Sequence, residues 1–136
     1  MDIDDEIVAS LSRGNDADLR TLVQQNMSLS RAIFANMPAL AEDAGYEPFS
    51  KDWVNRYWRN LLIEVSGKPV DKLFEWVLEA SAASVATLLV RRFDLDVAAY
   101  SAAIALAILL LRAAAAANHK KKPSTVAVKD QSTSDK

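Results

Sequence analysis

The side chains that most often carry out catalysis are scarce in this sequence. Histidine occurs once, at His119 inside a basic run, and cysteine does not occur. The lack of cysteine excludes thiolate nucleophiles and thiolate-bound metals, and a single histidine is too few for a multi-histidine metal site. Glu75 and Glu79 lie one helical turn apart, but two like charges at this spacing are typical of a solvated helix surface. We therefore expect a protein that is not an enzyme and that needs no cofactor and no metal.

The residues best suited to bind a partner form an aromatic and basic cluster. The cluster consists of Trp53, Arg56, Tyr57 and Arg59. Tryptophan, tyrosine and arginine dominate the hot spots of protein interfaces. If both aromatic rings are partly exposed, the cluster predicts a surface that contacts a protein partner. The alternative is the edge of a hydrophobic core that is covered by the stems of the arginines.

This cluster belongs to the clearest amphipathic helix of the sequence, which is expected over residues 51–66. Ser50 is a suitable N-cap, and Gly67 should end the helix before Pro69. Apolar residues recur along it at helical spacing and predict one buried face: Val54, Trp58, Leu61, Leu62 and Val65.

Other helices are expected on both sides of it. Short helices should begin at Asp2 or Asp4, at Asn15 or Asp16, at Ser28 or Ser30, and at Pro38. Helices of this length are marginal in water when isolated, so they should pack against one another. Beyond Pro69, the pattern predicts a single helix that continues to Val90, first amphipathic and then without charge after Glu79.

The most apolar stretch, residues 97–117, is long enough to cross a bilayer, because 21 helical residues span about 31 Å. The side chains expected within the membrane are Ile104, Leu106, Ile108, Leu109, Leu110 and Leu111. The basic residues around this stretch are expected to contact lipid headgroups: Arg91, Arg92, Arg112, Lys120, Lys121 and Lys122. The alternative is a buried helix of a soluble bundle.

Small residues recur at four-residue spacing in the same stretch, as in Ala98 with Ala102 and Ala103 with Ala107. This spacing lets helices approach closely in lipid and makes a homo-oligomer a further expectation. Alanine is so abundant here that such pairs also arise by chance.

Composition sets the size and class of the protein. The chain has 136 residues, of which 51% are hydrophobic, with few glycines and prolines and no alternating strand pattern. We expect an all-α protein: a helical domain over residues 1–92, an apolar membrane helix over 93–118 and a disordered polar tail over 119–136. The net charge of −2 argues against nucleic-acid binding, and the acidic amino terminus is unlike a cleaved signal peptide.

This layout resembles that of tail-anchored membrane proteins in general. It predicts a non-enzymatic interaction protein, or adaptor, that a single span near the carboxyl terminus holds at a membrane of unknown identity. Its partners would be membrane lipid and an unidentified protein. One alternative is a small pore-forming or membrane-disrupting effector in which residues 73–117 insert as a hairpin. Another is a soluble α-helical assembly protein with an Ala/Leu-rich helix at a subunit interface.

Overall fold

The computed structural model describes the backbone of residues 3–41 and 47–132, and the side chains of this part up to residue 118. It confirms the all-α class, because the described residues form helices and no strand. In chain order, the elements are α1 (Asp5–Ser12), α2 (Asp16–Gln24), α3 (Met27–Asn36), α4 (Pro38–Ala41), α5 (Lys51–Ser66), α6 (Val70–Glu79), α7 (Ala82–Arg92), the 3₁₀ turn η1 (Val97–Ala99) and α8 (Tyr100–Ser132).

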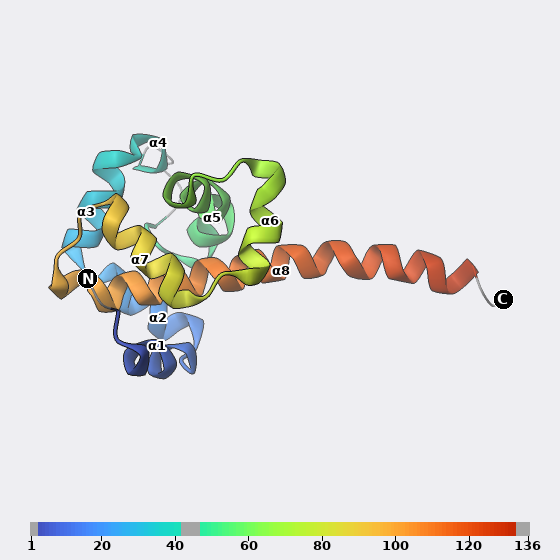
Figure 1. Ribbon diagram of the computed structural model, residues 1–136, viewed down its shortest axis with the longest axis horizontal. Coiled ribbons are helices and arrows are strands. Elements are labelled where there is room, and N and C mark those ends of the chain that lie inside the picture. Colours follow the sequence, from blue (N-terminus) through green and yellow to red (C-terminus); the bar gives the residue numbers. More distant parts are fainter. Residues whose placement is uncertain (1–2, 42–46, 133–136) are drawn as a thin grey trace.

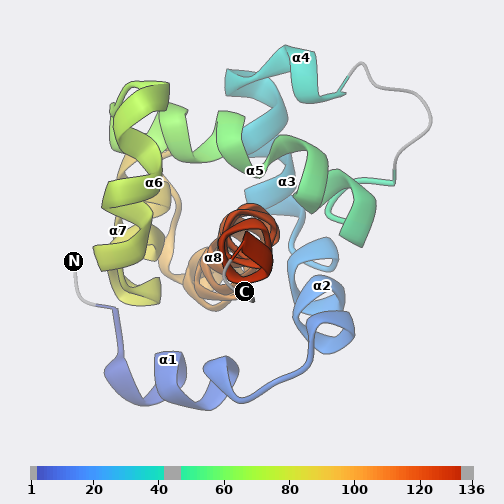
Figure 2. The ribbon, with the colours of Figure 1, turned by 90° about the vertical axis from the view of Figure 1, so that its right-hand side faces the viewer.

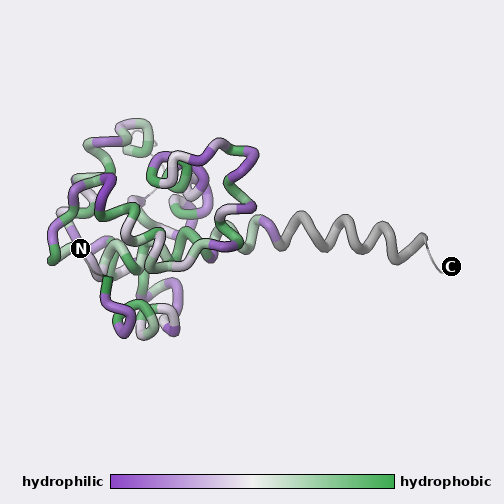
Figure 3. Tube along the Cα trace, viewed as in Figure 1, coloured by the Kyte–Doolittle hydropathy of each residue, from purple (hydrophilic) through white to green (hydrophobic). Residues whose placement is uncertain are grey.

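The helix α8 runs through the middle of the bundle, and the shorter helices surround it. Seen along its axis, α1, α2, α5, α6 and α7 lie around α8 (Figure 2). Its most extensive packing is with α7 and α2, followed by α5, and it also contacts α1 and α6. The outer helices alternate between hydrophilic and hydrophobic residues along their turns (Figure 3), as expected for helices with one buried face. The core of the described part is therefore organised around α8.

Capping residues explain where the outer helices begin. The side chains of Asp4, Asn15 and Asn26 each accept a hydrogen bond from a backbone N–H in the first turn of the helix that follows. Ser50 does the same for α5, as predicted, and Gly67 ends α5 with a left-handed φ of 71°. The third helix begins at Met27, before the predicted Ser28 or Ser30, because Asn26 provides the cap.

The single helix predicted from residue 70 to residue 90 is wrong. It is two helices, because the backbone is extended at Ala80, with ψ of 146°, and again at Ser81, with ψ of 161°. The Ser81 side chain accepts a hydrogen bond from the Ser84 N–H and caps α7. Periodicity did not reveal this break, since small and apolar residues continue across it.

The carboxyl-terminal part also differs from the expected layout. The apolar stretch that the sequence sets apart as a separate anchor is the centre of the same core as α1 to α7. Beyond Asn118, α8 continues as a helix to Ser132 and leaves the bundle (Figure 1), where the sequence predicts a disordered tail. Elongating an existing helix adds one hydrogen bond for each residue that is fixed, and the preceding alanines favour this.

Candidate functional site

The two aromatic residues of the predicted partner surface lie in the core. Trp53 is 1% exposed and Tyr57 is 8% exposed. The Trp53 ring contacts Phe49, with ring centroids 4.6 Å apart, and Phe34, with centroids 6.2 Å apart. The prediction required both rings to be partly exposed, and neither ring is.

The two arginines of the cluster lie on the outside of α5. Arg56 and Arg59 are exposed, and their guanidinium carbons lie 5.9 Å from the Tyr57 ring centroid and 5.5 Å from the Trp58 ring centroid. This geometry matches the alternative in which arginine side chains cover the edge of an aromatic core. Contact of Arg56 and Arg59 with a protein partner stays a prediction.

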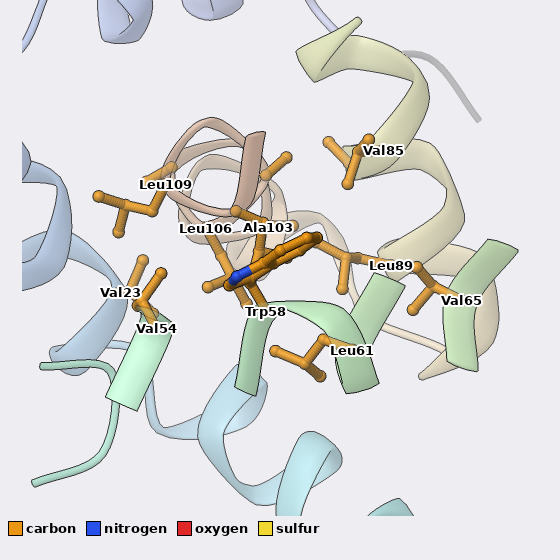
Figure 4. Packing of buried hydrophobic residues seen from close by; sticks show 14 of the residues in the cluster. Val23, Val54, Trp58, Leu61, Val65, Val85, Leu89, Ala103, Leu106 and Leu109 are labelled. Carbon is orange, nitrogen blue, oxygen red and sulfur yellow. The ribbon is translucent and has the colours of Figure 1, made fainter. Parts of the chain in front are cut away.

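The side chains predicted to lie in a membrane are covered by the protein's own helices. Leu106 and Leu110 are 0% exposed, Ile104 is 1% exposed, and Ile108 and Leu109 are at most 5% exposed. Leu111 is half-buried. Figure 4 shows Leu106 and Leu109 of α8 among residues of other helices, including Val23 and Trp58.

Length and composition still allow this helix to cross a membrane. Val97–Asn118 is the one helix in the described part that is long and apolar enough, and 67% of its apolar window is buried within the bundle. A central helix of a soluble core satisfies the same criteria. The coarse prediction of one apolar helix near the carboxyl terminus is confirmed, and its insertion into a membrane is a proposal.

The basic residues predicted at the headgroups are found in different surroundings. Arg91 is exposed at the end of α7. Arg92 donates from Nε and Nη2 to Oε2 of Glu64 on α5, over 2.8 and 2.5 Å. Lys120, Lys121 and Lys122 have side chains outside the described part.

Arg112 joins α8 to the amino-terminal helices. Its Nη1 donates to Oδ1 of Asp16 over 2.5 Å, and its Nη2 donates to the backbone carbonyl of Ser12 over 2.8 Å. A charge within an apolar helix needs a partner or contact with water, and this requirement could be predicted from the sequence. The identity of the partner was not, because 18 acidic residues compete for the role.

The described residues contain no group of three or more His, Asp or Glu side chains that could hold a metal ion. No family model, curated protein or solved structure matches this chain.

Proposed function

We propose that this chain is a non-enzymatic helical interaction module that works as a water-soluble fold, with α8 as its core helix. The observation that supports this most strongly is the burial of α8 by five helices of the same chain. If α8 crossed a bilayer permanently, the apolar faces of α2, α5 and α7 would lose the helix against which they pack. Exposing those faces to water is costly, at about 25 cal/mol for each Å² of apolar surface.

Exposed arginines and exposed apolar side chains on the surface of the module are suited to binding. Arg56 and Arg59 lie exposed on α5, and both are long side chains next to aromatic rings. On α6, Val70 is 56% exposed and Leu78 is 65% exposed. Arginine is enriched at protein interfaces and the centres of interfaces are apolar, so α5 and α6 each present side chains suited to binding a protein.

Truncation tests the proposal, because α8 as a core helix and α8 as a membrane anchor predict opposite results. The variants are the full chain, a chain that ends at Asp96 and a control that ends at Asn118. The control keeps the buried part of α8 and lacks residues 119–136. We expect the full chain and the control to stay in the supernatant without detergent and to unfold cooperatively on heating, as followed by circular dichroism. The chain that ends at Asp96 should lack cooperative unfolding, since its core has lost the central helix.

The opposite pattern would support a membrane-anchored adaptor. In that case the full chain resists carbonate washing of the membranes, while the chain that ends at Asp96 is soluble and folds cooperatively. That result overturns the proposal, because the outer helices would then form a core without α8.

A second candidate function is a membrane-inserting effector that stores its apolar helix within a soluble bundle. The length and apolar character of Val97–Asn118 favour it. It predicts that the soluble full chain releases dye from liposomes, whereas an interaction module leaves the liposomes intact. Leu111→Arg places a charge in the apolar helix at a residue that is only half-buried in the bundle, and it should abolish leakage by an effector.

A further inference from the structure

A cavity of about 370 Å³ lies where the first turns of α2 and α5 meet the carboxyl-terminal end of the buried part of α8. Ligand pockets in proteins have volumes of about 300 to 1,000 Å³, so this cavity suits a small molecule. Its lining divides into a charged part and an apolar part, and each part restricts the chemistry of what can bind.

The charged part has an excess of positive charge. Arg20 and Lys51 lie on α2 and α5, Arg112 lies on α8, and Asp16 is the one acidic residue among those that line the cavity. Asp16 is paired with Arg112, which leaves the charges of Arg20 and Lys51 without compensation from the lining itself. This local excess contrasts with the net charge of −2 for the whole chain, and it favours an anion.

The amino-terminal ends of two helices also lie at the cavity. Asp16 is the first residue of α2, and Lys51 is the first residue of α5. The amino-terminal end of a helix carries a partial positive charge, because its first backbone N–H groups have no partner within the helix. Asn15 and Ser50 already cap these two ends, and carboxylates of Asp16, Asp18 and Asp52 lie in the first turns, so the preference for an anion rests on Arg20 and Lys51.

The apolar part of the lining is formed by α5 and α8. Val54 is 2% exposed, Leu109 is 3% exposed and Ala113 is 8% exposed, and all three line the cavity. Figure 4 shows Val54 and Leu109 on the side of α8 that faces α2 and α5. A short hydrocarbon group can lie against these side chains and against the exposed Ala116, which also lines the cavity, whereas an inorganic anion would contact the charged part alone.

We propose that this cavity binds a small amphipathic anion, which is one carboxylate or phosphate group on a short apolar chain. The anionic group lies next to Arg20 and Lys51, and Asn55 lines the same cavity and offers a polar amide. The apolar chain lies over Val54 and Leu109. The site requires α8 to be packed in the bundle, so it rests on that part of the proposed function and goes beyond it.

The test uses the folded full-chain protein and hexyl phosphate as the probe. Titration followed by ¹H–¹⁵N and methyl NMR should show saturable shifts at Val54, Leu109 and Ala113. Hexanol, which lacks the charge, and inorganic phosphate, which lacks the chain, should each bind at least about tenfold more weakly, because each loses one of the two contributions. Shifts that do not saturate, or that lie on other helices, overturn the proposal.

A matched pair of variants separates this site from general charge attraction. Arg20→Gln with Lys51→Gln removes two charges at the cavity, and Lys68→Gln with Lys72→Gln removes two charges from exposed residues near α6. The first pair should weaken binding of hexyl phosphate about tenfold or more, and the second should leave it unchanged. Equal weakening by both pairs contradicts a specific site. Circular dichroism of both variants verifies that the fold is kept.

The anion could be a free molecule or the phosphate of a lipid headgroup, and vesicles distinguish these sources. If Arg20→Gln with Lys51→Gln alone weakens binding to phosphatidylcholine vesicles that contain phosphatidylglycerol, the ligand is a lipid headgroup. If hexyl phosphate binds and these vesicles do not, the ligand is a free amphipathic anion. If neither binds saturably, the proposal is wrong. The proposed function is tested separately, by the solubility and unfolding of the truncated chains.

Discussion

Arg112 of α8 and Asp16 of α2 form an ion pair that links the central helix to one of the helices around it, with Nη1 and Oδ1 2.5 Å apart. The same arginine donates to the backbone carbonyl of Ser12, the last residue of α1. The side chains of Arg112 and Asp16 are 36% and 48% exposed, so water and salt reach the pair. Sequence reasoning assigned Arg112 to lipid headgroups, and in the bundle its charge is satisfied by the protein.

The exposure of this pair sets the size of its effect on stability. We expect Asp16→Asn to lower the free energy of unfolding by about 0.2 to 1 kcal/mol at low salt, the usual range for solvent-accessible ion pairs. The loss should shrink as sodium chloride is raised, because salt screens the interaction. Urea unfolding at low and high salt measures both effects. Since Asp16 also lies at the positive end of α2, a double-mutant cycle with Arg112→Gln, made alone and together with Asp16→Asn, isolates the coupling between the two residues.

The position of Leu106 at the centre of the bundle predicts a much larger effect. Leu106 is 0% exposed on α8, whereas Leu78 is 65% exposed on α6. Leu106→Ala should lower the free energy of unfolding by about 2 to 5 kcal/mol, because it removes buried methyl groups and leaves a cavity. The control Leu78→Ala should change it by less than about 0.5 kcal/mol. If urea unfolding gave similar losses of unfolding free energy for Leu106→Ala and Leu78→Ala, α8 would lie outside the core.

The sequence was sufficient to predict the helical class and the helix α5. Ser50 and Gly67 are unambiguous end signals, and the apolar face between them has a regular period. The same reasoning missed the boundary at Ser81, since a serine among small residues is a weak signal and no proline or glycine marks the break.

The surroundings of α8 could not be predicted from the sequence, for a physical reason. A helix enclosed by other helices and a helix enclosed by lipid both need apolar side chains on all sides. Small residues such as Ala103 and Ala107, both 0% exposed, permit close packing in either environment. The cavity lining was equally hidden, because Arg20, Lys51 and Arg112 come together only when α2, α5 and α8 are folded.

The cap at Ser81 gives a direct test of the boundary between α6 and α7. The Ser81 Oγ accepts a hydrogen bond of 3.1 Å from the Ser84 N–H. Ser81→Ala should therefore lower the free energy of unfolding by about 1 kcal/mol. Ser81→Asp should keep most of the stability of the unchanged protein, because aspartate is also a good N-cap. Chemical denaturation of both variants measures this. If Ser81→Ala were neutral or stabilising, residues 70–90 would behave as one continuous helix, as the sequence predicted.

On α5, Trp53 is buried in the core and Arg59 is exposed, so substitutions at these two residues should affect stability very differently. Trp53→Ala should lower the free energy of unfolding by about 3 to 5 kcal/mol, because the ring packs on Phe49 and is 1% exposed. Trp53→Phe should cost less, since it keeps an aromatic ring and Nε1 of Trp53 has no hydrogen-bond partner among the described residues. Arg59→Ala should cost at most about 1 kcal/mol, the worth of an exposed contact between a cation and an aromatic ring. Thermal and urea unfolding of the three variants give this order. An unfolding free energy that is unchanged in Trp53→Ala would mean that the ring is available to a partner, and it would restore the interface that the sequence predicted.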